Sequence, residues 1–141
     1  MVTTIGLVLA SAAGCQDESR LSERDARDVA SRAEGPVFYV GTEFAGLPLT
    51  RAKTGPEGSP VDAYFVYGDC EPSGDEPRCT PPLQIQSAVC ANGGTRVGIF
   101  VSHGFPRGQG QLRALVWSLR SAGDGEAPAP EEIRFDLGPS C

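Results

Sequence analysis

Two alternating segments joined by a short glycine turn constrain the fold of this chain more than any other feature. Residues 83–90 and 95–102 alternate apolar with polar or small side chains, and this pattern is typical of strands that bury one face. Between them lies Ala91-Asn92-Gly93-Gly94, and its Asn-Gly pair suits a tight turn that needs positive φ. We therefore expect an antiparallel hairpin over 83–90 and 95–102.

Two further segments have the features of helices. Ser22 followed by Asp25 is a helix N-cap signal, so we expect a polar helix over about 22–33 that stops at Gly35-Pro36. A second amphipathic helix is expected later in the chain, where four apolar residues follow helical spacing and Trp117 lies off their stripe: Leu112, Leu115, Val116 and Leu119.

Short β-rich runs at 37–40, 61–67 and 133–137 predict additional strands. The 61–67 run is apolar on both alternations in its second half, as in a central strand covered on both faces. Residues 41–60 are rich in Gly and Pro, and we expect them to be mostly loop. Together the segments predict an α+β domain, in which a small antiparallel sheet of about four to five strands packs with one or two helices.

The first fifteen residues point to export. Residues 1–14 are uncharged, and the apolar run that starts at Ile5 has the length of a signal-peptide core but is too short to span a bilayer, which takes ~20 residues. Ala12-Ala13-Gly14-Cys15 resembles the lipobox of bacterial lipoprotein precursors. The resemblance implies that Cys15 receives a diacylglyceryl group and becomes the first residue after cleavage.

On this interpretation the chain has three parts: a signal peptide over 1–14, a lipid-anchored tether over 15–21 and one domain over 22–141. The domain would lie on the extracytoplasmic face of a bacterial cell membrane or envelope, with the membrane as its partner through Cys15. More than one acyl chain makes such an anchor stable.

The cysteine count fits this interpretation. The chain has five Cys, and acylation of Cys15 leaves an even number, as expected for disulfides in an exported protein. We expect a disulfide-stapled domain with Cys70–Cys79 closing a polar loop and Cys90–Cys141 holding the last residue, although four cysteines allow three connectivities. The spacing does not match zinc ligands, so we expect no metal or other cofactor.

Three segments invite a chemical interpretation. Ser102-His103-Gly104-Phe105-Pro106 resembles the oxyanion-hole turn of α/β-hydrolases, but the chain has one His and no G-x-S-x-G motif. Acidic residues within 69–76 could bind calcium, although solvated charge on a turn is the simpler interpretation. Arg107 and Arg113 flank a glycine-rich loop, which lacks the phosphate-binding fingerprints.

Charge and the lack of a catalytic set narrow the function. The net charge is −6 and Arg residues are scattered, so we expect no nucleic-acid partner. We expect a cell-envelope lipoprotein that acts as a non-catalytic binding or assembly module. The alternatives are a small exported hydrolase-like enzyme that uses His103, and a module that binds a soluble ligand in a groove with Tyr39, Tyr64 or Trp117.

Overall fold

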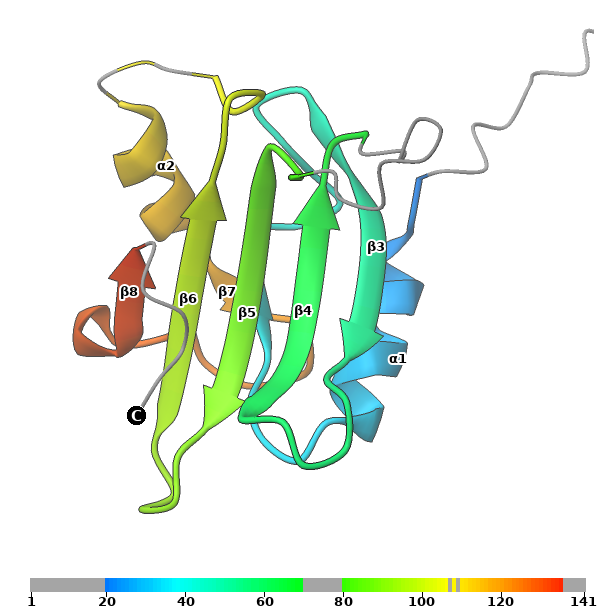
Figure 1. The fold of residues 1–141 in the computed structure, drawn as a ribbon, viewed down its shortest axis with the longest axis vertical. Helices are drawn as coiled ribbons and strands as arrows, with labels where there is room; N and C mark the ends of the chain where they lie inside the picture. Colours follow the sequence, from blue (N-terminus) through cyan, green and yellow to red (C-terminus); the bar gives the residue numbers. More distant parts are fainter. Residues whose placement is uncertain (1–19, 70–79, 107, 109, 136–141) are drawn as a thin grey trace, which may run out of the picture.

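The structure is a computed structural model that describes residues 20–69, 80–106, 108 and 110–135. The α+β class is confirmed (Figure 1). The elements follow in the order α1 (Glu23–Arg32), β1 (Phe38–Tyr39), β2 (Glu43–Phe44), β3 (Leu47–Thr54), β4 (Val61–Tyr67), β5 (Leu83–Val89), β6 (Thr95–Val101), α2 (Gln111–Ser118), β7 (Arg120–Ser121), the 3-10 helix η1 (Pro130–Glu132) and β8 (Ile133–Phe135).

The main sheet is larger than expected and it is mixed. Six strands lie in the order β2-β3-β4-β5-β6-β8, and β1 with β7 forms a separate two-stranded sheet. We expected four to five antiparallel strands, but β8 runs parallel to β6. The chain between these two strands contains α2, β7 and η1, and a connection of this length can bring a strand back parallel to an earlier one.

The expected hairpin is confirmed. β5 and β6 pair in continuous antiparallel register from Leu83 opposite Val101 to Val89 opposite Thr95. The turn between them has Gly93 at φ +83°, and the Gly93 N–H donates to the Cys90 carbonyl at 2.9 Å. The strands therefore meet in the register that the apolar alternation and the Asn-Gly turn both require.

The expectation that residues 41–60 are mostly loop is wrong, because β3 occupies eight of them. The Gly and Pro residues lie chiefly on either side of this strand, so a composition taken over the whole segment hides it. Pro48 is tolerated at the start of β3, where its carbonyl accepts the Gly68 N–H at 2.8 Å and no donor is demanded of it.

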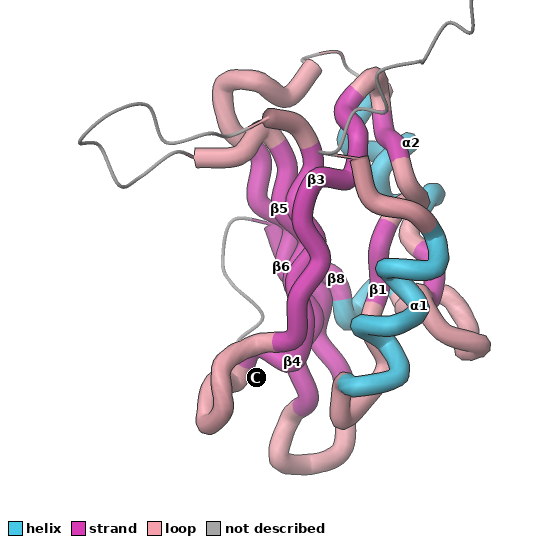
Figure 2. Tube along the Cα trace, turned by 90° about the vertical axis from the view of Figure 1, so that its right-hand side faces the viewer, coloured by secondary structure: helices cyan, strands magenta, loops and turns pink. Residues whose placement is uncertain are grey.

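One face of the main sheet is covered and the other is open. α1, α2 and the β1–β7 pair all lie on the same side of the sheet (Figure 2). Their apolar side chains form one core with the inward residues of the strands; the largest of its fully buried side chains include Tyr67, Phe65, Leu49, Leu83, Ile85, Ile99, Leu115 and Val29.

We call the opposite side of the main sheet the open face. By strand alternation and register it carries Arg51, Lys53, Tyr64, Val66, Gln84, Gln86, Ala88, Arg96, Gly98, Phe100 and Arg134. β4 lies between β3 and β5, as expected of a central strand. Its cover on this face is only partial, since Val66 is buried but Tyr64 is half-buried.

α1 forms where its N-cap signal placed it. The Ser22 side chain accepts the Asp25 N–H, and the Asp25 carboxylate accepts the Ser22 N–H at 2.7 Å, which completes a capping box. Ala26 and Val29 are buried beneath the helix, whereas its outward residues are mostly charged. After the helix, the Asp62 carboxylate accepts the N–H groups of Glu34 and Gly35, each at 2.9 Å.

Candidate functional site

Most of the predicted cysteine sites lie outside the described residues. These are Cys15, Cys70, Cys79 and Cys141. Cys90 is described: it follows β5, its side chain is 6% exposed, and it is disulfide-bonded. Its partner lies outside the described residues, so the pairing with Cys141 stays a prediction. Of the acidic segment 69–76, Asp69 alone is described, and it is exposed.

The His103 loop is built around a buried phenylalanine rather than around the histidine. Phe105 is buried and stacks on Phe44 with ring centroids 6.2 Å apart. The Ser102 hydroxyl donates to the Pro81 carbonyl at 2.7 Å, so its hydrogen is used in a hydrogen bond to the backbone and not in one to His103. His103 is exposed, and within the described part of the chain no carboxylate or hydroxyl is hydrogen-bonded to its imidazole. These residues do not assemble a catalytic dyad.

The three aromatic residues named as candidates for a ligand-binding groove lie in three different places. Tyr39 is buried against Phe65 at 5.5 Å between ring centroids, and the Arg120 guanidinium lies 5.2 Å from the Tyr39 ring. Tyr64 lies on the open face. Trp117 lies on the outward side of α2. Strand alternation and helix position therefore separate the three rings, and the ligand-binding alternative stays a prediction.

α2 carries the largest exposed side chain in the described part of the protein. Leu115 is fully buried and Leu119 nearly so, while Trp117 is 82% exposed. Residues two apart on a helix are separated by about 200°, so burial of Leu115 directs Trp117 away from the core. Within the described residues, little of its indole is covered. The sequence placed Trp117 off the apolar stripe, and the structure shows that the ring is almost completely solvated.

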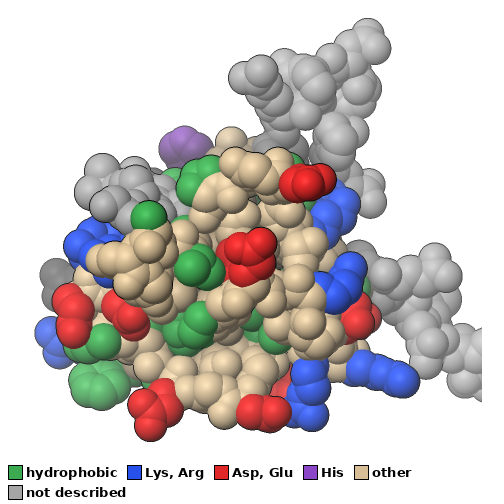
Figure 3. Space-filling model, turned by 90° about the horizontal axis from the view of Figure 1, so that it is seen from below, with side chains coloured by type: hydrophobic (Ala, Val, Ile, Leu, Met, Phe, Trp, Pro, Cys, Tyr) green, Lys and Arg blue, Asp and Glu red, His purple; other side chains and the backbone are tan. Residues whose placement is uncertain are grey.

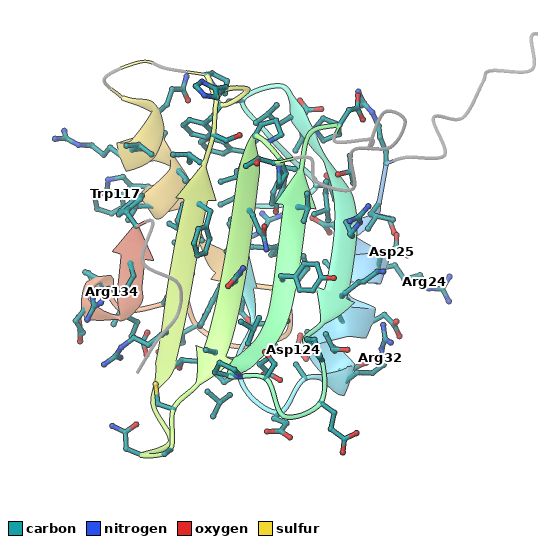
Figure 4. The ribbon with its side chains drawn as sticks, viewed as in Figure 1. Arg24, Asp25, Arg32, Trp117, Asp124 and Arg134 are labelled. Carbon is teal, nitrogen blue, oxygen red and sulfur yellow. The ribbon has the colours of Figure 1, made fainter. Side chains whose placement is uncertain are left out.

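The other exposed large apolar residues lie in the same two elements. Leu112 on α2 is 44% exposed and Phe135 on β8 is 38% exposed. Both elements lie at the β6–β8 end of the sheet (Figure 1), and Trp117 and Arg134 occupy the same side of the molecule (Figure 4). We call this edge of the molecule the α2–β8 edge; Leu112, Arg113 and Trp117 lie on α2, and Phe135 lies on β8.

This edge has the chemistry of a binding surface. Arg113 precedes Trp117 by one helical turn, so a cation and an indole share one stripe of α2. β8 is the last strand of the main sheet, and an edge strand presents backbone groups that another chain can bind. Trp and Arg are the side chains most enriched among residues that dominate interface energies. Sequence analysis missed Leu112 and Phe135, since periodicity assigned both to the core.

A pocket of about 270 Å³ lies at the opposite end of the sheet from the His103 loop. It is formed by the β3–β4 connection and the residues after α1, and Asp62 and Glu57 are among the carboxylates that line it. Asp62 is already used by two backbone N–H groups. Seen from this end, acidic and basic side chains lie next to one another (Figure 3). Among the described residues no cluster of His, Cys, Asp or Glu could hold a metal ion.

Comparison with known protein families, characterised proteins and solved structures finds no match to the chain. None of the helices in the described segments has the length and hydropathy needed to cross a membrane. The candidate site therefore rests on α2 and β8, which carry an exposed indole and two partly exposed apolar side chains at the same edge of the sheet.

Proposed function

We propose that this chain is the precursor of a cell-envelope lipoprotein and that its folded domain is a non-catalytic protein-binding module. Cys15 would carry the acyl chains after removal of residues 1–14. The domain would then stand on the extracytoplasmic face of the membrane, separated from the lipid by the tether over 15–21. The support is the small-residue run that ends in Cys15 and the absence of charge before it.

The exposure of Trp117 is the single observation that carries the binding role. An indole that is 82% exposed leaves most of its apolar surface in water, and burying a large side chain of this kind stabilises a complex by about 1.5–3 kcal/mol. Arg113, one helical turn before Trp117, would supply charge-assisted hydrogen bonds to carboxylates of a partner. The partner that fits is therefore a protein surface with an apolar pocket and acidic side chains at its rim.

Two disulfides complete the proposal. Cys70–Cys79 would close the connection between β4 and β5, and Cys90–Cys141 would hold the end of the chain. Cross-links of this type raise stability mainly by restricting the unfolded chain, which suits a small domain outside the cell. The disulfide-bonded state of Cys90 supports this part of the proposal.

The anchor is tested by intact mass spectrometry of the membrane fraction. We expect a chain that starts at Cys15 and carries additional acyl mass, and Cys15→Ser should release the protein from the membrane with its residues 1–14 retained or cleaved elsewhere. A soluble wild-type product that retains Met1 would contradict the anchor.

The binding role is tested by a photo-crosslinking amino acid placed at position 117, with position 24 on α1 as the matched control. Arg24 is also an exposed helical residue, but it lies among charged neighbours. In intact envelopes we expect a discrete adduct from position 117 and none from position 24, and the adduct should be lost when Arg113→Glu is added. Equal adduct yields at the two positions, or no adduct at 117, would exclude the α2–β8 edge as the binding surface.

A further inference from the structure

The part of the open face formed by β3, β4 and β5 carries five polar side chains that the fold does not use for hydrogen bonds. They are Arg51, Lys53, Tyr64, Gln84 and Gln86, and we call them the β3–β5 patch. Figure 1 views the sheet from this side, with α1 behind β3. The two basic residues are exposed and the other three are half-buried. Within the described part of the chain, no hydrogen bond or ion pair joins any of the five side chains to another group of the protein.

The strand register places these side chains in two adjacent rows. Lys53 lies opposite Tyr64, which lies opposite Gln86, so this row crosses two strand spacings, about 10 Å. The next row is two residues along the strands, about 7 Å away, and has Arg51 on β3 and Gln84 on β5 at its two ends. Two cations, one aromatic ring and two amides therefore lie side by side on one flat surface.

The patch is positively charged, because the open-face positions of β3, β4 and β5 that the register defines include no Asp or Glu. Asp62, at a bulge in β4, accepts two backbone N–H groups. Glu43 on β2 is paired with Arg20 at 3.7 Å. The chain as a whole has a net charge of −6, so Arg51 and Lys53 form a local positive surface on an acidic protein. Such a surface attracts an anionic ligand.

The side chains of the patch define the chemistry of that ligand. Arg51 and Lys53 can bind carboxylates, and a guanidinium can do so through two parallel hydrogen bonds. A Gln amide both donates and accepts hydrogen bonds, so Gln84 and Gln86 match groups that do both, such as hydroxyls. The Tyr64 ring offers an apolar surface on which the C–H face of a sugar can pack. Carboxylates, hydroxyls and an apolar ring face occur together in uronic acids.

Other anionic ligands use fewer of these side chains. Single-stranded nucleic acid binds along a series of aromatic rings on which successive bases stack, and the β3–β5 patch has one ring. Peripheral membrane binding combines basic side chains with apolar ones that enter the headgroup region, whereas Tyr64 is half-buried and lies between a lysine and an amide. A linear acidic polysaccharide that lies along the flat surface uses all five side chains.

We propose that the β3–β5 patch binds an acidic polysaccharide through its uronate residues. The two basic side chains hold the carboxylates, the two amides bind hydroxyls, and the Tyr64 ring packs against a sugar ring. Trp117 lies on α2, which covers the opposite face of the sheet, so the polysaccharide and a protein partner do not compete for one surface. Binding at the β3–β5 patch does not require the acyl chains on Cys15.

Acetylation of the single lysine tests the site directly. Lys53 is the only Lys in the chain, so the peptide that contains it reports on the patch alone. In the full-length protein, a galacturonate oligomer should slow the modification of Lys53 by acetic anhydride several-fold. The methyl-esterified oligomer has the same rings without the charge and should protect Lys53 far less. Equal protection by the two oligomers, or protection by neither, would overturn the proposal.

Two further probes in the same labelling experiment identify a different ligand class. Poly-uridylate represents single-stranded nucleic acid, and phosphatidylglycerol vesicles represent an anionic membrane. We expect both to protect Lys53 less than the galacturonate oligomer does. Stronger protection by either probe would show that the patch binds nucleic acid or membrane, and the assignment to a polysaccharide would be wrong.

Calorimetric titration of variants with the galacturonate oligomer tests the role of each side chain. Arg51→Gln and Lys53→Gln should each weaken binding several-fold and should retain the fold, because both residues are exposed. Tyr64→Ala should also weaken binding, whereas Tyr64→Phe keeps the ring and should bind as the wild type does. Arg24→Gln on α1, which removes an exposed cation outside the patch, is the matched control. Unchanged affinity in both patch variants, or an equal loss in Arg24→Gln, would contradict the proposed site.

Discussion

The two helices cover the same face of the sheet, but they present different surfaces to solvent. α1 begins at a capping box, and the Arg120–Glu23 ion pair at 3.0 Å links it to β7. α2 begins at Gly110 without a side-chain cap and has no acidic residue in its first turn. The outward side of α1 is charged, whereas that of α2 carries Trp117.

The difference between the two helices indicates which solvent-exposed side chains serve stability and which are available for binding. A helix that only covers a core is optimised by caps and charged outward residues. α2 lacks a side-chain cap and has no acidic residue in its first turn, and it exposes an indole, which contributes nothing to the core. Trp is also among the side chains most enriched at positions that dominate interface energies. The predictions that follow test this contrast, in order of decreasing effect.

The largest expected effect lies within α2 itself. Leu115→Ala removes a fully buried side chain and should lower the free energy of unfolding by about 2–5 kcal/mol. Trp117→Ala should change it by no more than about 0.5 kcal/mol, because the indole is solvated. Urea titration of both variants measures this. A large loss of stability in Trp117→Ala would show that the indole is structural and would remove the contrast between the helices.

The second prediction concerns the segment that follows β1 on the α1 side. The buried Tyr67 hydroxyl donates to the Gly41 carbonyl at 2.8 Å and accepts the Val40 N–H at 3.1 Å. Tyr67→Phe leaves both backbone groups unpaired and should cost about 1–3 kcal/mol. A cost near zero, measured by urea titration at neutral pH, would mean that water replaces the hydroxyl.

The same hydroxyl predicts that the free energy of unfolding falls at alkaline pH. Burial raises the pKa of Tyr67 above its usual value of 10.0. The protonated hydroxyl therefore contributes stability that is fully present below pH 10 and is lost as the pH rises above 10, where the unfolded chain ionises first. Unfolding free energies between pH 8 and 11 should fall less steeply for Tyr67→Phe than for the wild type, with Tyr64→Phe as the matched control.

Removing the cap of α1 should have a smaller effect. Ser22→Ala deletes the side chain that accepts the Asp25 N–H and should cost about 1 kcal/mol. Hydrogen bonds from the Ser22 side chain and backbone hold the pKa of Asp25 below 3.8. Its contribution is present above pH 3.8 and is lost as the pH falls below it. As the pH falls, the free energy of unfolding should decrease less steeply in Ser22→Ala than in the wild type. The same decrease in both proteins would contradict the capping role of Asp25.

The smallest effect should be a gain in α2. Gly110 has a negative φ of −98° and open space where a Cβ would lie. Gly110→Ala should therefore stabilise the domain by about 0.4–1 kcal/mol, chiefly by restricting the unfolded chain. Gly104→Ala is the contrasting control, since its Cβ would lie 2.7 Å from the Pro82 Cγ. In thermal unfolding, the midpoint temperature of Gly110→Ala should be higher than that of the wild type, and that of Gly104→Ala should be lower.

The elements that the sequence predicted well are those specified by local signals. The β5–β6 hairpin has both alternation and an Asn-Gly turn, and α1 has a capping box. β3 was missed because it lies between glycine- and proline-rich turns. The parallel direction of β8 was missed because it depends on the path that the chain takes through α2 and η1 after β6. No local sequence pattern specifies that path.

For the candidate site, the sequence singled out Trp117 as lying off the apolar stripe of its helix. It could not show that Phe135 and Leu112 are also exposed, since both fit the spacing of core residues. Exposure at these positions depends on how far the neighbouring elements extend over them. The His103 motif is the opposite case, in which the sequence suggested a catalytic group that the structure does not assemble. A short local resemblance does not show which side chains lie close together in space.

Sequence alone determined the hairpin, the first helix and the α+β class, and it supplied the interpretation of residues 1–15 as a lipoprotein signal. These follow from propensity, alternation and short motifs, which act within a few residues. Tertiary structure decided the mixed sheet, its single open face and the edge that exposes Trp117. It also placed Cys90 at the end of β5 that lies away from Leu83.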